Sequence, residues 1–510
     1  MKQAILMLVV IISLNQYTNA QLRGECGTYD HENIFERLRI NKKALKDGNL
    51  RSSEVTYLPI KFHRVAESNG DQRIRISAVL DQMCRLQSDY APMEIVAYFK
   101  DLFNDLNNSN IFFNPQNASG QIIQNKDGGA VDIFITENAD AQGATGTVLG
   151  YYQPGGDFVI IRKVEVQDSS ATLSHELGHY LSLPHTHYPW ANSAAGFPAY
   201  DPSVFGNPID VQTISGNYGG PVRIELVDGS NCENSADEIC DTPPDFCFPF
   251  ALEVPSSGCN FGHEVYDYNG DLIAPMTNNT MGYFDSCDKY EFTPMQAEIM
   301  VADIKSNARN FLQSDYVPNT TEITDMPEII SPEFNTTVDF YNYVVFEWNE
   351  VENADYYLLE ISSNGETKSY LTQETSISVT DLEPNSNYFW LLAPFNETST
   401  CMKLGNQVFK TNNDLTSIET IENDAAQIHL FPNPVLAGQD VIINITSTKD
   451  FNAIMSLHNL EGKEMIASRP LSIQKNVNKI NINTSDFTPG VYVLRINSEN
   501  GSFTQKVIIK

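Results

Sequence analysis

Two histidines four residues apart constrain this chain more than any other feature of its sequence. In His175-Glu176-Leu177-Gly178-His179 the spacing places both imidazoles on one face of a helix, where they can bind the same metal ion. His185 follows six residues later and can join them only if the helix ends and the chain turns back. Pro184 supplies that end, because proline cannot donate a helical hydrogen bond and biases the residue before it away from helical geometry.

Three histidines and one glutamate are suitable groups for binding a zinc ion and activating a water molecule on it. Catalytic zinc typically has three protein ligands and one open position, so we expect His175, His179 and His185 to bind zinc. Glu176 adjoins the first ligand and is expected to act as the general base on a bound water. A pair of histidines at this spacing also occurs on solvated helices, but the third histidine and the helix stop favour a metal site. His187 lies just beyond the turn and is not expected to be a ligand.

The arrangement resembles the metzincins, zinc peptidases whose motif HExxHxxGxxH precedes a methionine turn. Ser182 stands where that family has glycine, and a left-handed backbone there costs a residue with a side chain about 1–2 kcal/mol. Either Ser182 bears that strain or Pro184 shapes the turn. The stretch Asn279-Thr280-Met281-Gly282-Tyr283 resembles the methionine turn. It implies that Met281 packs beneath the ligands, with an ordinary core methionine as the alternative, and that Tyr283 binds zinc or stabilises the reaction intermediate.

Further segments, across about residues 55–315, are similar to the pappalysin or cytophagalysin branch of the metzincins. They are His179-Tyr180-Leu181 with His185-Thr186, Cys240-Asp241-Thr242-Pro243-Pro244, and Asp285-Ser286-Cys287 with Phe292-Thr293-Pro294-x-Gln296. The resemblance implies an α/β (α+β) catalytic domain with a twisted mixed sheet and an active-site helix. It implies a secreted zinc-dependent endopeptidase that hydrolyses peptide bonds in protein or peptide substrates. It also implies a disulfide near the methionine turn, for which Cys259 and Cys287 are the candidates.

The same resemblance implies a possible calcium site, because some relatives bind calcium. Asp228, Glu238 and Asp241 lie in an acidic loop that suits calcium. A merely solvated acidic loop is the alternative.

Residues 21–54 are interpreted as a pro-segment, in which Arg37, Arg39 and other scattered basic residues offer cleavage points. The stretch Arg23-Gly24-Glu25-Cys26-Gly27-Thr28 resembles the start of the pro-segment in relatives with a cysteine switch. Since a thiolate is a good zinc ligand that would displace the catalytic water, the resemblance implies a zymogen kept latent by Cys26. The alternatives are a disulfide between Cys26 and Cys84, or a free thiol.

The N-terminus has the features of a secretory signal. Lys2 precedes an apolar run over residues 4–14, and residues 18–20 end in a small residue, so residues 1–20 are expected to be removed. An uncleaved anchor is the alternative. No later stretch reaches about 18 consecutive apolar residues, so no transmembrane segment is expected after removal of the signal. With 65 acidic and 32 basic residues the net charge is −33, which argues against nucleic acid and anionic membranes as partners.

The C-terminal third is expected to form two all-β sandwich domains. The pattern Leu382-x-Pro384-x-x-x-Tyr388-x-Trp390 resembles the tyrosine corner of fibronectin type III domains, over residues 328–412. Residues 424–510 resemble the C-terminal sorting domain of the type IX secretion pathway in Bacteroidetes, through segments 430–434, 459–463 and 487–496. The second resemblance implies recognition by that export machinery and a secreted or surface-attached protein. A second adhesive sandwich is the alternative.

Local patterns predict the main elements around the motif. Strands are expected at residues 56–65, 130–136 and 158–161, and helices at 76–106, interrupted near Pro92, and at 170–183. Thr293 and Gln296 form a predicted capping box, with proline first in a helix that runs to about residue 312.

Two other functions fit parts of the sequence. A surface adhesin that kept a peptidase fold would suit the two β domains, but it needs no general base such as Glu176 beside three metal ligands. A thermolysin-like enzyme would take a distant glutamate as third ligand, which His185 makes unnecessary.

Overall fold

A computed structural model describes residues 25–28, 31–48, 55–140, 147–190, 199–215, 221–251, 259–284, 287–413, 426–459, 462–498 and 501–510. The expected signal peptide, residues 1–20, lies outside these ranges. The chain divides into two compact units: unit 1 comprises Met1–Glu328, Asn349–Thr375 and Trp390–Asn406, and unit 2 comprises Ile329–Trp348, Ser376–Phe389 and Gln407–Lys510. This division runs through the expected fibronectin-like segment, 328–412, and so differs from the domain boundary expected there.

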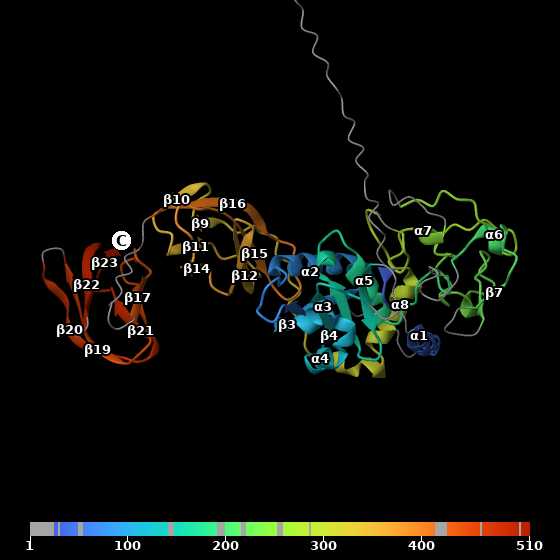
Figure 1. The fold of residues 1–510 in the computed structure, drawn as a ribbon, viewed down its shortest axis with the longest axis horizontal. Helices are drawn as coiled ribbons and strands as arrows, with labels where there is room; N and C mark the ends of the chain where they lie inside the picture. The colour runs from blue at the N-terminus through green and yellow to red at the C-terminus, as the bar shows by residue number, and fades with distance from the viewer. Residues whose placement is uncertain are drawn as a thin grey trace, which may run out of the picture. The chain divides into compact units, whose positions relative to one another are not determined.

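A six-stranded mixed sheet forms the centre of unit 1 (Figure 1). Its strands are β1 (Glu25–Cys26), β2 (Thr56–Ala66), β3 (Ile95–Asn107), β4 (Val131–Thr136), β5 (Val148–Gln153) and β6 (Phe158–Arg162), in the order β1-β5-β6-β4-β2-β3. Strands β2, β3, β4 and β6 pair in parallel, whereas β5 runs antiparallel to β6. The predicted strands at 56–65, 130–136 and 158–161 coincide with β2, β4 and β6.

Three helices pack against this sheet or against one another. They are α2 (Ile76–Tyr90), α5 (Thr172–Tyr180) and α8 (Pro294–Ile304). The expected helix over 76–106 is wrong in its second half: after α2 and a short 3-10 turn the chain forms β3. Glu94 has φ 56°, a left-handed conformation that ends the helical path, and the buried residues Ile95, Ala97 and Phe99 then alternate toward the core. The predicted capping box is present, because Thr293 and Gln296 exchange side-chain to backbone hydrogen bonds at the start of α8.

The segment expected to be a pro-segment is folded onto unit 1 where the structure describes it. Strand β1 pairs in parallel with β5 at the edge of the sheet, and helix α1 (His31–Lys46) packs along α8. Two of the basic residues that were interpreted as cleavage points form ion pairs, Arg37 with Asp303 and Arg39 with Glu238. Residues 49–54, between this segment and β2, lie outside the described ranges.

The remaining elements of unit 1 are short or belong to the fibronectin-like segment. The short ones are α3 (Ser109–Phe113), α4 (Ser119–Gln124), α6 (Pro202–Phe205), β7 (Thr213–Ile214), β8 (Val222–Arg223), α7 (Phe248–Ala251) and the 3-10 helix η6 (Asn307–Leu312). Strands β12 (Tyr356–Ser363) and β13 (Glu366–Thr372) pair as a hairpin, and β15 (Asn387–Phe395) supplies Phe395 to the core of unit 1. The expected helix over 294–312 is therefore α8 followed by η6.

Unit 2 is all-β, as the sequence predicts for this part of the chain. Its strands are β9 (Ile329–Ser331), β10 (Thr336–Val338), β11 (Val344–Trp348), β14 (Ser376–Val379), β16 (Leu404–Thr411), β17 (Ala426–Phe431), β18 (Asp440–Ser447), β19 (Phe451–Asn459), β20 (Glu464–Ile473), β21 (Asn476–Asn483), β22 (Gly490–Ser498) and β23 (Gly501–Ile509). From residue 426 onward, a three-stranded sheet β17-β18-β21 and a four-stranded sheet β20-β19-β22-β23 share one core, which makes a sandwich.

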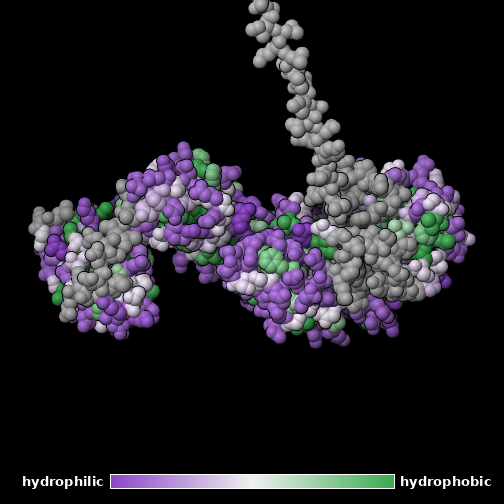
Figure 2. All heavy atoms as spheres, viewed as in Figure 1, coloured by the Kyte–Doolittle hydropathy of each residue, from purple (hydrophilic) through white to green (hydrophobic). Residues whose placement is uncertain are grey.

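The face of the molecule seen in Figure 2 is mainly hydrophilic where it is coloured. Within the described ranges, no helix combines the length and the apolar character needed to cross a membrane.

Candidate metal centre

Helix α5 carries the first two histidines and ends where the sequence predicts a stop. Leu183 N donates to the carbonyl of Gly178 at 2.9 Å and Ser182 N to that of His179 at 3.0 Å, the paired bonds of a Schellman cap. The left-handed position of this cap is Ser182, with φ 69°. Ser182 therefore bears the conformation that glycine favours, and the chain turns back so that His185 faces the helix.

The three histidines meet at one point. Nε2 of His185 lies 3.2 Å from Nε2 of His175 and 3.0 Å from Nε2 of His179. On the opposite side of each ring, Nδ1 of His175 lies 2.7 Å from the carbonyl oxygen of Thr280, and Nδ1 of His179 lies 2.7 Å from that of Leu183. A carbonyl accepts only an N–H, so these bonds fix the tautomer that leaves both Nε2 lone pairs directed at His185.

This arrangement fits a bound cation. Burial lowers the pKa of His175 to about 4, so its ring is neutral at physiological pH. Neutral imidazole lone pairs about 3 Å apart repel unless a cation lies among them, and imidazole is a preferred ligand of zinc. The histidines join Cys26 in a group whose ligand atoms all lie within 4.8 Å of one another, and among the described residues this is the one such group. The cluster could therefore hold a metal ion.

Glu176 is fully buried beside the histidines. Its Oε2 accepts hydrogen bonds from Thr28 Oγ1 at 3.1 Å, from Tyr152 N at 3.1 Å and from Cys26 Sγ at 3.4 Å. Its Oε1 is buried and has no hydrogen-bond partner among the described residues. Burial raises the pKa of Glu176 to about 7, against the opposing effect of those hydrogen bonds. A carboxyl in this state can both accept and return a proton near neutral pH.

Cys26 reaches the centre because β1 lies along β5. The pairing places Cys26 opposite Gly150, and Gly27 N donates to the carbonyl of Gly150 at 2.9 Å. The alternative of a disulfide with Cys84 is wrong, because Cys84 is bonded to Cys401. Cys26 is a free thiol, and its sulfur lies within 4.8 Å of the ligand atoms of the three histidines.

Met281 and Tyr283 also contact the helix and the rings of the histidine cluster. Met281 is fully buried, and a β-carbon added to Gly178 would lie 2.3 Å from its sulfur, so the thioether rests directly against the bare backbone of α5. The ring of Tyr283 lies 5.0 Å from that of His185 and 4.3 Å from that of His187, between ring centroids. His187 stacks on His185 at 4.6 Å. The structure thus brings the predicted methionine turn to the histidine cluster.

Disulfides hold the long loop that leads to this turn. Cys259 and Cys287 form the predicted disulfide, and a second joins Cys232 to Cys240. Cys247, also in this region, takes part in no disulfide.

The three carboxylates expected to bind calcium are not gathered. Asp228 is exposed, Glu238 pairs with Arg39, and Asp241 accepts hydrogen bonds from Thr293 Oγ1 and Met295 N at the start of α8. The loop between β8 and α7 contains three other buried carboxyls that the sequence did not single out, Glu225, Asp237 and Asp245. Burial raises the pKa of all three, and the charge of Asp237 raises that of Glu225 further.

Sequence reasoning also missed Thr28 and Arg37. Thr28 binds Glu176 and Tyr152 where the expected pro-segment meets the sheet. Arg37 binds Asp303. Their partners lie more than a hundred residues away in the sequence, so no local pattern indicates them; position within the expected pro-segment was the one available signal.

Comparison with known proteins identifies one end of the chain. Residues 429–510 match the family model of the secretion system C-terminal sorting domain. This domain marks proteins exported by the type IX system in Bacteroidetes, so the protein is secreted or attached to the cell surface and is handled by that export machinery. No curated protein matches the chain.

Solved structures align only with parts of the chain. Chicken CNTN1 FN1-FN3 domains align at 11% identity over 37% of this chain and 68% of that one, with a TM-score of 0.17. FN3tt aligns at 21% identity over 18% of this chain and 100% of its own, with a TM-score of 0.15. Dimeric latent PorU from Porphyromonas gingivalis aligns at 16% identity, with a TM-score of 0.17, and the alignment covers 36% of this chain and 20% of PorU. At these TM-scores the alignments carry no argument about the fold.

Proposed function

We propose that this chain is a secreted zinc-dependent endopeptidase of the metzincin type, similar to pappalysins and made as a latent zymogen. The observation that carries the proposal is the convergence of three histidine nitrogens beside the buried carboxyl of Glu176. The methionine turn against Gly178 and the disulfide between Cys259 and Cys287 support the same family.

His175, His179 and His185 would hold the zinc ion. Zinc bound there acts as a Lewis acid on a water molecule and on the scissile carbonyl. Glu176 takes the proton from the water, since its pKa near neutrality suits a general base, and returns it to the leaving amine. Tyr283 is assigned the role of donor to the developing oxyanion.

The edge of the central sheet supports a polypeptide substrate. Strand β5 pairs with β6 on one side and with β1 on the other, so departure of the pro-segment leaves an open strand edge beside Glu176. An extended peptide can pair with such an edge through main-chain hydrogen bonds. This geometry brings a scissile bond alongside the histidines.

Replacing Glu176 by Ala tests the function. The variant is expected to keep its zinc, measured by elemental analysis, and to lose about 10²–10⁴-fold or more of its turnover of a denatured-proteome peptide library. His185→Ala is the matched control and should lose the metal. Proteolysis retained in Glu176→Ala would refute the assignment.

The same experiment separates the other candidate functions. Zinc binding with no cleavage of any library peptide by the activated wild type, with and without a chelator, would favour a non-catalytic adhesin. Metal and activity retained in His185→Ala would favour a thermolysin-like site with a distant third ligand.

Latency is proposed to depend on Cys26. Its sulfur belongs to the group of possible metal ligands formed with the three histidines, and it donates a hydrogen bond to Glu176. Cys26→Ala is expected to give activity before any cleavage of the pro-segment, because a thiolate can no longer occupy the open zinc position. Activity of the uncut variant on a fluorogenic peptide measures this. Unchanged latency would assign the thiol a structural role.

A further inference from the structure

Helix α1 contacts the rest of unit 1 through residues that lie outside the histidine cluster and Cys26. Its apolar face is buried: Ile34 and Leu38 are fully covered and belong to the core, and the ring of Phe35 lies 4.7 Å from that of Tyr188. Residues 34 and 38 are one helical turn apart and so share a face. The helix therefore makes contacts with the enzyme in addition to the pairing between β1 and β5.

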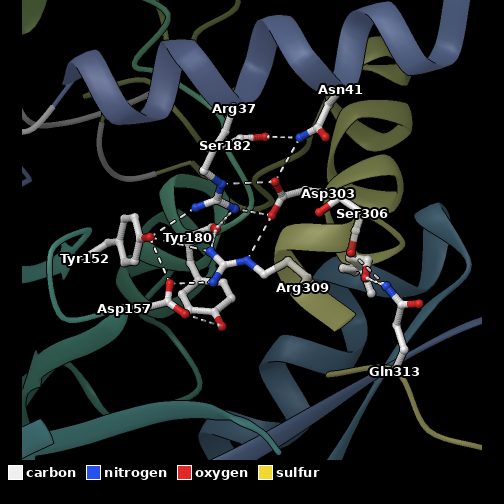
Figure 3. Close-up of polar contacts among 11 residues, drawn as sticks. Arg37, Asn41, Tyr152, Asp157, Tyr180, Ser182, Asp303, Ser306, Arg309 and Gln313 are labelled. Atoms are coloured by element: carbon white, nitrogen blue, oxygen red, sulfur yellow. Dashed lines mark hydrogen bonds and ion pairs between the residues drawn. The ribbon is translucent and has the colours of Figure 1, made fainter. Parts of the chain in front are cut away.

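Arg37 lies at the centre of this surface (Figure 3). Its guanidinium pairs with the buried carboxylate of Asp303 and donates to the carbonyl of Tyr180 at 2.8 Å and to the hydroxyl of Tyr152 at 3.1 Å. Arg309 of η6 also binds Asp303, at 3.2 Å, so this carboxylate keeps a cationic partner when α1 is absent. The enzyme side of the site is thus already built from buried, paired groups, which lowers the cost of burying Arg37.

Asn41 connects the helix to the turn between the second and third histidines. Its Nδ2 donates to Ser182 Oγ at 2.9 Å and to Asp303 Oδ1 at 2.8 Å (Figure 3). Ser182 is the residue that holds the left-handed cap position at φ 69°. A glycine there would relieve the backbone strain and would lack the oxygen that Asn41 binds. The departure from the metzincin pattern therefore has a structural counterpart in the pro-segment.

Charge favours the same contact. Helix α1 has five basic and two acidic side chains, a net charge of +3, in a chain whose net charge is −33. Arg39 binds Glu238 at 3.1 Å and Lys46 binds Glu233 at 2.9 Å. Only four residues separate Cys26 from the start of α1, so a bound helix keeps the thiol at high effective concentration beside the histidines.

We propose that the surface formed by Asp303, Ser182 and the Tyr180 carbonyl is a second binding site for the pro-segment, one that holds residues 31–48 independently of Cys26. A single cut between residues 48 and 55 then leaves the inhibitory segment in place. Activation of the wild type, in which the bound helix keeps Cys26 beside the histidines, then requires that α1 dissociate or be degraded. The link to latency rests on the proposed function, whereas the binding itself does not.

The test uses the full chain with residues 49–54 replaced by the recognition sequence of a site-specific protease. After cutting, size-exclusion chromatography and mass spectrometry measure whether the fragment ending at residue 48 stays bound. We expect co-elution for the wild type and for Cys26→Ala. We expect about 10- to 100-fold faster loss of the fragment for Arg37→Ala, which removes a hydrogen-bonded charge at a largely buried site, and faster loss for Asn41→Ala and Ser182→Gly. Lys43→Ala removes one charge from an exposed position of the same helix and should behave as the wild type.

A peptide competition experiment tests the same binding site without substitutions in the enzyme. A synthetic peptide of residues 31–48 should displace the fragment from the cut wild type, and the peptide with Arg37→Ala should need at least about ten times the concentration. Retention unaffected by Arg37→Ala and Asn41→Ala, or loss of the fragment on Cys26→Ala alone, would overturn the second site. Either result leaves the peptidase assignment standing, because that depends on turnover by Glu176 and the histidines.

Discussion

Gly178 shows how a single missing side chain shapes the surroundings of the histidine cluster. It lies between the two histidines of α5, and an added β-carbon would lie 2.3 Å from Met281 Sδ and 3.2 Å from Met281 Cε. Because Met281 is fully buried, its side chain must rearrange within the core to make room for that carbon. Alanine normally favours a helix over glycine by about 1 kcal/mol, but here the collision opposes and outweighs that gain.

Gly178→Ala is therefore expected to destabilise unit 1 by about 1–3 kcal/mol, which scanning calorimetry would record as a lower Tm. Gly120 is the matched control, because it also lies in a helix and its added β-carbon would have no neighbour within 4 Å. Gly120→Ala should leave Tm unchanged or raise it. Combining Gly178→Ala with Met281→Ala should cost less than the sum of the two changes; strict additivity would rule out the contact as the cause.

Residues whose partners are close in sequence were predictable, and those with distant partners were not. The spacing of His175, His179 and His185 follows from helical geometry and one proline, so the sequence alone predicts their convergence. Cys84 pairs with Cys401, which lies 317 residues away, and nothing near either cysteine indicates this. Thr28 and Arg37 belong to the same class.

At the scale of elements, local patterns predicted strands β2, β4 and β6 but wrongly assigned residues 95–107 to a helix. Residues 95–107 have apolar spacing that suits either a helix or a half-buried strand, and their place beside β2 in the sheet decided for the strand. Helix α1 was not predicted, because its polar composition resembles a solvated linker until the acidic partners on unit 1 are known. Tertiary contacts outweighed local preference in both cases.

Three buried carboxyls give the loop between β8 and α7 a pH-dependent stability. Burial raises the pKa of Glu225, of Asp237 and, to about 6, of Asp245 above their ordinary values in the unfolded chain. The folded protein therefore holds protons that the unfolded chain has released, and the free energy of unfolding falls as pH rises above about 4.5 toward the raised values. Thermal unfolding without added calcium should show a Tm that decreases from pH 5 to pH 8.

Glu225→Gln should flatten this decrease, because an amide does not titrate. Glu233→Gln is the control, since Glu233 is exposed at the same loop and should leave the slope nearly unchanged. If calcium binds Glu225 and Asp237 rather than the three carboxylates first suggested, adding it should raise Tm more at pH 8 than at pH 5. An equal effect at both pH values would exclude calcium from this position.

At the scale of the whole molecule, unit 1 extends beyond residue 315, where the catalytic domain was expected to end. Glu360 of β12 is buried and accepts hydrogen bonds from Ser77 Oγ at 2.6 Å and from Ser77 N at 3.2 Å, at the start of α2. The carbonyl of Glu397 accepts a hydrogen bond from Phe99 N at 2.9 Å, and the disulfide between Cys84 and Cys401 adds a covalent link. The resemblance that ends near residue 315 and the all-β pattern beyond residue 328 predict a domain boundary between them, but these contacts cross it.

A chain that ends at residue 328 is therefore expected to fold poorly, because it exposes the core around Phe99 and leaves Cys84 without its partner. A chain that ends at residue 413 keeps every element of unit 1 and should match the full chain in Tm and in resistance to limited proteolysis. The double change Cys84→Ala with Cys401→Ala in the longer chain should lower the stability of unit 1 by about 2–4 kcal/mol, because the link closes a long loop in the unfolded state. Equal Tm values for the chains ending at 328 and 413 would show that residues 349–406 are a separate module. The domain boundary would then lie between residues 315 and 328, as expected from the sequence.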